Sequence, residues 1–528
     1  MAFARILSAD QAAALVPDNA VVTVSSSSGL GCPDAVLAAI GRRFENEGHP
    51  RELTTLHPIA AGDMWGVKGI DHIAREGLLK KILAGSYPSG PSSAPPPLIW
   101  QMVTGNKIPA YNIPSGILFD MHRDAAAKRP GVLTKVGLDT FVDPRHDGCA
   151  MNARAKAEPV VKLVQFAGDD WLHFDAIAPA VAIIRATTAD ERGNLSCEHE
   201  GGVLGSLDQA LAVRNNGGLV IAQVKRLAKF GTLKPHHVLV PGVLVDVIVV
   251  APDQMQTTHT PYDPAISGEI FRPLDSFERP EFGVQKVIAR RVAQEMRRGD
   301  AVNIGFGVSA NVPRILLEEG CHGDVTWVIE QGAVGGIPLL DFQFGCSSNA
   351  ESIVPSPALF TYFQGAGFDA SLLSFLEIDS EGSVNVSKLS HRPHVTAGAG
   401  GFVDITARAR RIIFSGFFTA GAKLEISGGK LVIAREGKVR KLVETVEQVT
   451  FSGRRAREQG QQIAYVTERC VMELREVGVT VTEIAAGVEL ERDVLAQAEF
   501  KLHVADDLRL IDPCLFDPAP FGLKLKEA

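Results

Sequence analysis

One carboxylate is distinguished by the residues on either side of it. Glu330 follows the apolar, largely β-branched residues 325–329, and three glycines lie among the next six residues. Such a short run is typical of a buried strand, and glycines let backbone amides approach a ligand closely. Ligands bind at the carboxyl ends of the strands in open α/β sheets. The pattern therefore assigns the chemistry to Glu330.

Taken alone, a glutamate at a strand end is more often a solvated surface residue, since charged side chains mostly face water. Two further glycine loops, residues 305–309 and 398–402, favour the functional interpretation. Bare backbone N–H groups bind phosphates and oxyanions, and such loops expose them.

The same residues support a second hypothesis. Gly305-Phe-Gly-Val-Ser-Ala310 is a G-x-G-x-x-A motif between an expected strand and an expected helix. In an NAD-dependent dehydrogenase, this loop would hold the pyrophosphate and Glu330 would bind the ribose. Pro313, early in the helix pattern, and the many glycines after Glu330 argue against it. On the residues alone, both hypotheses stay open.

The elements that must position Glu330 follow an order that occurs twice. Each time, a strand leads through a small-residue loop into a helix and then a second strand. The first copy covers residues 20–24, 25–31, 33–44 and 53–56, and the second covers 301–304, 305–309, 311–319 and 325–329. The turns at 190–196 and 379–385 are also similar, which suggests a duplicated unit.

The chain is expected to be an α/β protein of two related, open, mostly parallel sheet domains covered by helices. Near-continuous apolar strands favour this class, and 528 residues exceed a single core. We place the domains at 1–275 and 285–528, with the active site between them. The first carries extra sequence at 63–152, including a loop at 91–97, and an antiparallel addition is expected at 423–450.

Composition limits the class of protein further. The formal net charge of −8 gives no reason to expect nucleic acid as a partner. The seven cysteines are scattered and never form Cys-x-x-Cys, which favours reduced thiols in the cytoplasm over a disulfide or zinc framework. No signal peptide is visible, and the most apolar run, residues 243–251, is short enough to be a buried strand. We expect no membrane partner.

Several longer motifs show a family resemblance. Glu330-Gln-Gly-Ala-Val-Gly-Gly336 resembles the E-x-G-x-x-G-G nucleophile motif of the family I CoA-transferases. The segments at 110–116, 130–145, 400–405, 465–469 and 495–500 are similar to other signatures of the single-chain type, in which two subunits are fused. The resemblance covers residues 10–513. Two segments depart from the family pattern, at 25–31 and 360–369, and both are expected to line the acyl pocket.

The resemblance implies an enzyme that moves CoA from a short-chain acyl-CoA to acetate, propionate, acetoacetate or a similar acid. Glu330 would form an acyl-glutamyl anhydride and then a glutamyl-CoA thioester, with ping-pong kinetics. An acyl-CoA hydrolase on the same scaffold is the alternative if water reaches the thioester. No tightly bound cofactor is expected, because coenzyme A is a substrate. The family suggests a homodimer or homotetramer.

The expected site residues follow from these motifs. Backbone groups of Gly29, Gly31, Gly400 and Gly401 are candidates for stabilising oxyanions. By resemblance, the CoA contacts are Gly305, Phe306, Gly307, Val308, Ser309, Gly401 and Lys423, the last as a point charge for a phosphate. Trp327, Val334 and Phe402 are candidates for excluding water.

Other polar clusters are weaker candidates. His391 and His394 are separated by a proline, and His236 and His237 lie in a turn, so neither pair predicts a metal site. The serines at 25–28 lack a nucleophile elbow and an evident histidine partner, which favours a hydrogen-bonding loop.

Overall fold

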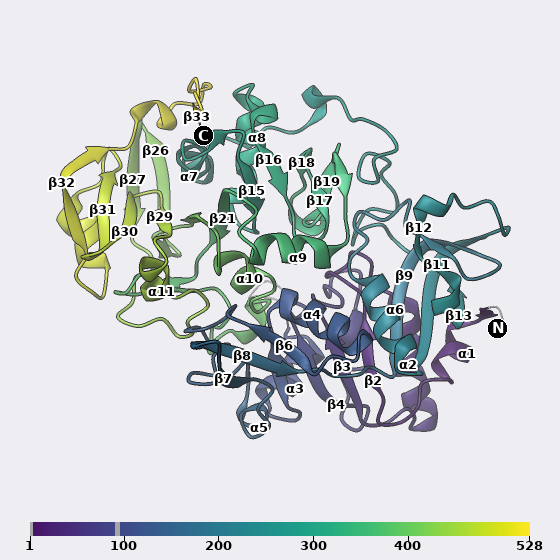
Figure 1. Ribbon diagram of the computed structural model, residues 1–528. Coiled ribbons are helices and arrows are strands. Elements are labelled where there is room, and N and C mark those ends of the chain that lie inside the picture. Colours follow the sequence, from purple (N-terminus) through teal and green to yellow (C-terminus); the bar gives the residue numbers. More distant parts are fainter. Residues whose placement is uncertain (1–3, 90–94, 528) are drawn as a thin grey trace.

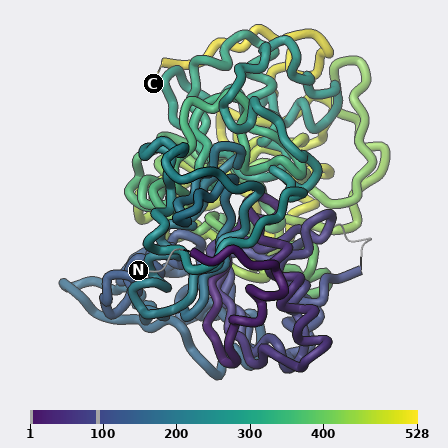
Figure 2. Tube along the Cα trace, turned by 90° about the vertical axis from the view of Figure 1, so that its right-hand side faces the viewer, coloured from purple at the N-terminus to yellow at the C-terminus, as the bar shows by residue number. Residues whose placement is uncertain are grey.

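The computed structural model describes residues 4–89 and 95–527. It contains two large sheets, one built from residues before 251 and one from residues after 300. Figure 1 shows them in separate halves of the molecule, the first in purple to blue-teal and the second in teal-green to yellow. The side view in Figure 2 shows the same separation, so the predicted pair of related α/β sheets is confirmed.

The first sheet is parallel along its main path, which runs β1-β13-β11-β9-β2-β3-β4-β5. Its strands are β1 (Arg5–Leu7), β13 (Val247–Val250), β11 (Leu219–Ala228), β9 (Val181–Asp190), β2 (Val21–Val24), β3 (Leu53–His57), β4 (Leu79–Ala84) and β5 (Ala110–Asn112). Two short strands, β10 (Leu195–Ser196) and β12 (Val238–Val240), join antiparallel beside β9.

Helices cover both faces of this sheet because its strands are apolar on both sides. In β9, Ile183 packs into one core with α1 (Ala9–Ala13), α2 (Asp34–Glu47) and α3 (Leu98–Thr104). The adjacent Ile184 packs into the opposite core with α6 (Ser206–Asn215). This is the burial expected of a parallel sheet with helices on either side.

The second sheet has a parallel centre, antiparallel pairs on either side of it and one parallel pair at an edge. Its order is β20 (Ser352–Ile353), β17 (Ala333–Val334), β16 (Thr326–Val328), β15 (Ala301–Ile304), β21 (Ala370–Ser374), β24 (Arg411–Ser415), β29 (Gln462–Val466), β30 (Cys470–Arg475), β31 (Gly478–Ile484) and β32 (His503–Leu510). The strands from β16 to β29 are parallel, whereas β17, β20 and β30 pair antiparallel with their neighbours.

Helices also cover both sides of the second sheet. One core contains α7 (Val284–Ala293) and α8 (Val312–Glu318). The other contains α9 (Ser356–Gln364), α10 (Phe402–Thr406) and α11 (Gly453–Glu458).

The centres of the two sheets share one strand order. In the first, β2 lies between β3 and β9, and in the second β15 lies between β16 and β21. The turns at 190–196 and 379–385 also share a geometry. In each, the first residue, Asp190 or Asp379, accepts hydrogen bonds from the backbone N–H groups of the residues two and four positions later. The boundary between residues 275 and 285 remains a prediction.

Several expected elements differ in extent. The strand before Glu330 is only three residues long. The apolar run at 243–251 is not one continuous strand, because a 3₁₀ turn at Gly242–Leu244 precedes β13, which covers Val247–Val250. Residues 423–450 do form an antiparallel hairpin, β26 (Lys423–Ser427) with β27 (Lys430–Arg435), but it is separate from the large sheet. Of the loop expected at 91–97, residues 91–94 lie outside the described residues.

The extra sequence of the first half supplies real elements. It contains β4, α3 and β5 of the sheet edge, and α4 (Ser115–Ala126) follows directly. A small antiparallel sheet of β6 (Gly131–Thr134), β8 (Asp169–Asp175) and β7 (Lys162–Phe166) comes next. Helix α4 contacts α9 and α10 of the other half, as Figure 1 shows, so this insertion builds the contact between halves.

Within the described part of the chain, no helix is long and apolar enough to cross a membrane. All seven cysteines carry free thiols.

Candidate active site

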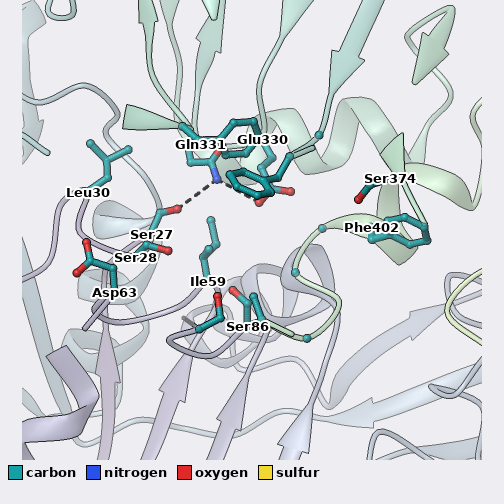
Figure 3. Close-up of a pocket in the computed structure, with 18 of the residues that line it drawn as sticks. Ser27, Ser28, Leu30, Ile59, Asp63, Ser86, Glu330, Gln331, Ser374 and Phe402 are labelled. Carbon is teal, nitrogen blue, oxygen red and sulfur yellow. Dashed lines mark hydrogen bonds between the residues drawn. The ribbon is translucent and has the colours of Figure 1, made fainter. Parts of the chain in front are cut away.

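A cavity of about 720 Å³ lies between the two halves, and Glu330 lines it. The first half contributes the loop with Ser27 and Ser28, together with Ile59. The second half contributes Ser374 on its opposite side. In the close-up of Figure 3, Glu330 lies between these two groups of residues. The cavity therefore has one arm on each side of the carboxylate.

A tight turn holds Glu330 at the end of β16. The N–H of Ile329 donates to the Ala333 carbonyl at 2.9 Å, and the Gly332 N–H donates back to the Ile329 carbonyl at 2.9 Å. Gly332 has a φ of 129°, and a Cβ there would lie 2.3 Å from the Val354 carbonyl oxygen. Glycine is therefore required here, because a side chain would meet both strain and backbone.

The carboxylate has neighbours from both halves. The Gln331 Nε2 group lies 3.2 Å from Glu330 Oε1 and 3.2 Å from Ser27 Oγ, as the dashed lines in Figure 3 show. The backbone of Gly401 also hydrogen bonds to the Glu330 carboxylate. A Cβ added to Gly401 would lie 2.1 Å from Glu330 Oε2, so only glycine allows this close approach.

Burial raises the pKa of Glu330 from about 4.5 to about 7, although hydrogen bonds from Gly401 and Gln331 oppose the shift. The carboxyl is thus about half protonated at pH 7, whereas a glutamate with its ordinary pKa would be almost fully ionised there. The neighbouring Asp404 is fully buried, and burial raises its pKa to about 7 as well. Asp120 and Glu330 add to that shift by charge repulsion.

This pKa predicts a pH profile. If Glu330 is the nucleophile that the resemblance implies, only its ionised form can attack. We then expect kcat/KM for an acyl-CoA to rise about tenfold per pH unit below pH 7 and to level off above it. Steady-state rates from pH 5 to 9 would measure it. A midpoint near 4.5 would contradict the burial of Glu330. If Asp404→Asn removes the midpoint altogether, Asp404 rather than Glu330 is the group that titrates.

The structure brings together part of the expected set of residues. Gly29, Gly305, Phe306, Gly400 and Gly401 line the cavity with Glu330. The amides of Gly400 and Gly305 are already committed, because they donate to the Gly85 and Leu372 carbonyls at 2.7 and 2.8 Å. Among the glycines proposed for oxyanion binding, Gly401 is the one whose backbone contacts the carboxylate.

The remaining expected residues lie away from the cavity lining: Gly31, Gly307, Val308, Ser309 and Lys423. Gly31 faces Leu204, and the Ser309 hydroxyl is buried against Ser415 Oγ at 2.5 Å. Of the residues expected to exclude water, Phe402 lines the cavity, whereas Trp327 and Val334 do not.

Lys423 lies on the hairpin β26, with its side chain 65% exposed and its Nζ 3.4 Å from Glu425. A solvated, paired lysine outside the cavity contributes little to binding. We therefore expect Lys423→Ala to change KM for acyl-CoA by less than about twofold, measured by initial rates at low and high salt. A tenfold rise in KM that disappears at high salt would instead support the expected phosphate contact.

The sequence patterns did not identify three side chains that lie near Glu330 or hold the loop beside it. Gln331 bridges Glu330 and Ser27, Asp404 is buried close to Glu330, and Asn112 holds the loop before Gly401. Asn112 and Asp404 both lie inside motifs that carried the resemblance, at 110–116 and 400–405, which was the available signal. Their function depends on contacts across roughly 290 positions, which local patterns do not reveal.

Neither histidine pair forms part of a metal cluster. Among residues 4–89 and 95–527, no group of three or more His, Cys, Asp or Glu side chains could hold a metal ion.

Comparisons with known proteins identify the family of this chain. Residues 6–251 match the family model described as Coenzyme A transferase. The caffeate CoA-transferase of Acetobacterium woodii is 40% identical, covering 98% of this chain and 99% of its own. The acetate CoA-transferase YdiF of Escherichia coli K12 is 38% identical, covering 99% and 97%.

A solved structure is similar over the same extent. The acyl-CoA transferase YdiF of E. coli O157:H7, in a thioester complex with CoA, has a TM-score of 0.91 and 37% identity, covering 100% of this chain and 98% of that one. None of these relatives is named a hydrolase or a dehydrogenase, so those alternatives are not favoured. The chain is an enzyme of the CoA-transferase type and belongs to the family I CoA-transferases that carry both subunits fused in a single chain.

Proposed function

We propose that this enzyme moves CoA between short-chain carboxylic acids by a ping-pong mechanism through a glutamyl-CoA thioester on Glu330. One observation carries the proposal. A glutamate carboxyl faces the cavity between the halves while the Gly401 backbone bonds to it. A partly buried carboxylate with a backbone donor is suited to act as a nucleophile.

The first half-reaction has two steps. The Glu330 carboxylate attacks the thioester carbonyl of the acyl-CoA, the C–S bond breaks, and CoA leaves as a thiolate from an acyl-glutamyl anhydride. The thiolate then attacks the Glu330 carbonyl carbon, which releases the donor acid as its carboxylate and leaves the glutamyl-CoA thioester. An incoming acid reverses both steps, so no net proton transfer is required.

The Gly401 contact supports a specific role in the second step. The Gly401 backbone lies against Oε2 of Glu330, the oxygen that becomes an oxyanion when the thiolate attacks the glutamyl carbonyl. A hydrogen bond that strengthens as this charge develops lowers the barrier. The acyl oxyanion of the first step lies elsewhere in the cavity, where Gly29 is the remaining glycine of our expected set.

The two arms of the cavity separate the two substrates in this proposal. The arm toward Gly305 and Phe306 opens at the surface, with Phe306 64% exposed, which suits the long CoA chain. The arm toward Ser27, Ser28 and Ile59 presents two hydroxyl groups beside one apolar side chain, which suits a small carboxylic acid. The relatives act on acetate and on caffeate by name, so acids of both sizes belong in the test.

The covalent intermediate is directly testable. The enzyme would be incubated with acetyl-CoA alone, digested at low pH and analysed by mass spectrometry. We expect CoA attached to the peptide that contains Glu330, with release of acetate in the absence of an acceptor. Parallel lines in double-reciprocal plots would support ping-pong kinetics, whereas intersecting lines and an absent adduct would reject the mechanism.

A screen of acceptors would then define the acid. Acetate, propionate, acetoacetate and caffeate would be compared by kcat/KM against one acyl-CoA. Each added methylene changes binding by about 1–3 kcal/mol in a pocket, which such a series resolves. Thiol release that continues without any acceptor would favour hydrolysis. The homodimer or homotetramer and the cytoplasmic location expected from the sequence stay predictions.

A further inference from the structure

The loop that carries Gly401 belongs to the second half in sequence but is held by the first half in space. The Tyr87 N–H donates to the Ala397 carbonyl at 2.7 Å, and the Gly400 N–H donates to the Gly85 carbonyl at 2.7 Å. The Ser115 N–H, at the start of α4, donates to the Gly400 carbonyl at 3.0 Å. Residues 397–400 therefore lie along the carboxyl edge of the first sheet, opposite the strand that ends at Glu330.

One side chain lies at the centre of this contact. Asn112, the last residue of β5, is only 4% exposed. Its Oδ1 accepts the Ala399 N–H at 2.8 Å, and its Nδ2 donates to the Gly85 carbonyl at 2.5 Å and the Ala84 carbonyl at 3.2 Å. A single amide thus joins the end of β4 to the loop two residues before Gly401.

The fit between Asn112 and the loop is close on the other side as well. Gly398 has a φ of 84°, and a Cβ there would lie 2.9 Å from both the oxygen and the nitrogen of the Asn112 side-chain amide. The backbone packs directly on the amide at this point. A shift of the Asn112 side chain would therefore move the loop, and a shift of the loop would move the Gly401 backbone relative to Glu330.

We propose that Asn112 is a positioning residue for catalysis, which fixes the Gly401 N–H against the Glu330 carboxylate from the opposite half of the molecule. The inference rests on the proposed function, because it assigns the Gly401 donor a role in the reaction of Glu330. Asn112 does not line the cavity and acts only through the loop. Through Asn112, the position of the Gly401 N–H relative to Glu330 depends on the contact between the two halves.

The test compares Asn112→Ala with a matched control. Asn152 has the same bonding pattern, since its Nδ2 donates to the Val103 and Ile108 carbonyls and its Oδ1 accepts the Ala155 N–H. It holds α5 (Ala153–Lys156), remote from the cavity lining. Asn152→Ala therefore reports the cost of losing a structural asparagine in the same half of the protein.

For Asn112→Ala we expect kcat to fall about 10- to 100-fold, because a displacement of roughly 1 Å at a catalytic donor has an effect of this size. KM for acyl-CoA should stay within about threefold, since the cavity lining is unchanged. The midpoint of the pH profile should move up, because the bond from Gly401 lowers the pKa of Glu330. For Asn152→Ala, kcat and the midpoint should both stay as in the wild type.

A shift of the pH midpoint distinguishes positioning from mere stability, since partial unfolding lowers the amount of active enzyme without changing the pKa of what remains. If Asn112→Ala does not fold, Asn112→Ser, which removes fewer atoms, is measured instead. The inference would be overturned if the folded Asn112 variant had the kcat and the pH midpoint of the wild type. It would also be overturned if its kcat fell by no more than that of Asn152→Ala. A wild-type enzyme without the CoA adduct on Glu330 would overturn the proposed function instead.

Discussion

Glu330→Ala is expected to lose acetate-dependent CoA transfer almost completely, with kcat lower by a factor on the order of 10⁴ or more, as for removal of the nucleophile in other covalent enzymes. Without the carboxylate, neither the anhydride nor the thioester can form. The measurement is the rate of acetyl-CoA exchange at saturating substrates, together with the mass of the enzyme after incubation with acyl-CoA.

Glu351→Ala is the matched control. Glu351 is an exposed glutamate directly before β20, its N–H donates to the Val334 carbonyl of β17, and it does not line the cavity. We expect it to keep wild-type kcat. Transfer that survives in Glu330→Ala at more than about a tenth of the wild-type rate would show that another group carries the acyl or CoA moiety.

The same side chain should limit stability, with a sign set by its pKa. Because burial raises the folded-state pKa of Glu330 to about 7, its stabilising contribution is complete below its ordinary value of about 4.5 and is lost as pH rises through 7. Glu330→Gln stays neutral, so its free energy of unfolding should exceed that of the wild type by about 2 kcal/mol at pH 8. Near pH 4 the two should agree, as thermal unfolding at both pH values would show.

Gly401→Ala is expected to produce the second largest loss, a fall in kcat of about 10²- to 10³-fold, as for removal of one oxyanion donor elsewhere. The backbone angle allows alanine, but its Cβ would lie 2.1 Å from Glu330 Oε2 and 2.8 Å from the Phe360 ring. Either the Glu330 carboxylate or the loop at 397–401 must move. The backbone N–H of residue 401 then lies farther from the oxygen on which the negative charge develops. Single-turnover rates of adduct formation would measure the effect.

Gly323→Ala controls for this substitution, because a Cβ there meets no atom within 4 Å and the backbone is not in the left-handed region. Its kcat should match the wild type. If Gly401→Ala lowers only stability and leaves single-turnover rates intact, the Gly401 backbone has no role in stabilising the oxyanion.

The repeated order of strand, loop, helix and strand was visible in the sequence because it depends on local patterns. The short, mostly apolar runs that contain Val302 and Trp327 identify strands, and Pro313 fits the first turn of α8. The length of β16 was not visible. Residues 325–329 all have strand chemistry, but the return of β17 through Ala333 ends the strand at Val328, which is a tertiary effect.

The insertion at 63–152 shows a second limit. The sequence predicted only a loop at 91–97 within it, yet the insertion adds β4 and β5 to the sheet edge and leads into α4. Pairing of β4 with β3 holds these strands on the sheet, with β5 added beside β4, and contacts with α9 and α10 of the other half stabilise α4. Neither partner is near in sequence, and strand propensity depends strongly on such neighbours.

The sequence by itself determined the reaction class and predicted Glu330 as the nucleophile, because a carboxylate followed by closely spaced glycines is a local pattern within a motif of the family. Only the tertiary structure decided which amide faces that carboxylate, that burial raises its pKa to about 7, and that Lys423 lies outside the cavity. The physical reason is that desolvation and hydrogen-bond geometry depend on atoms brought together from both halves. Asn112 and Gly401 are 289 positions apart in the chain, yet the Asn112 side chain accepts a hydrogen bond from Ala399, two residues before Gly401.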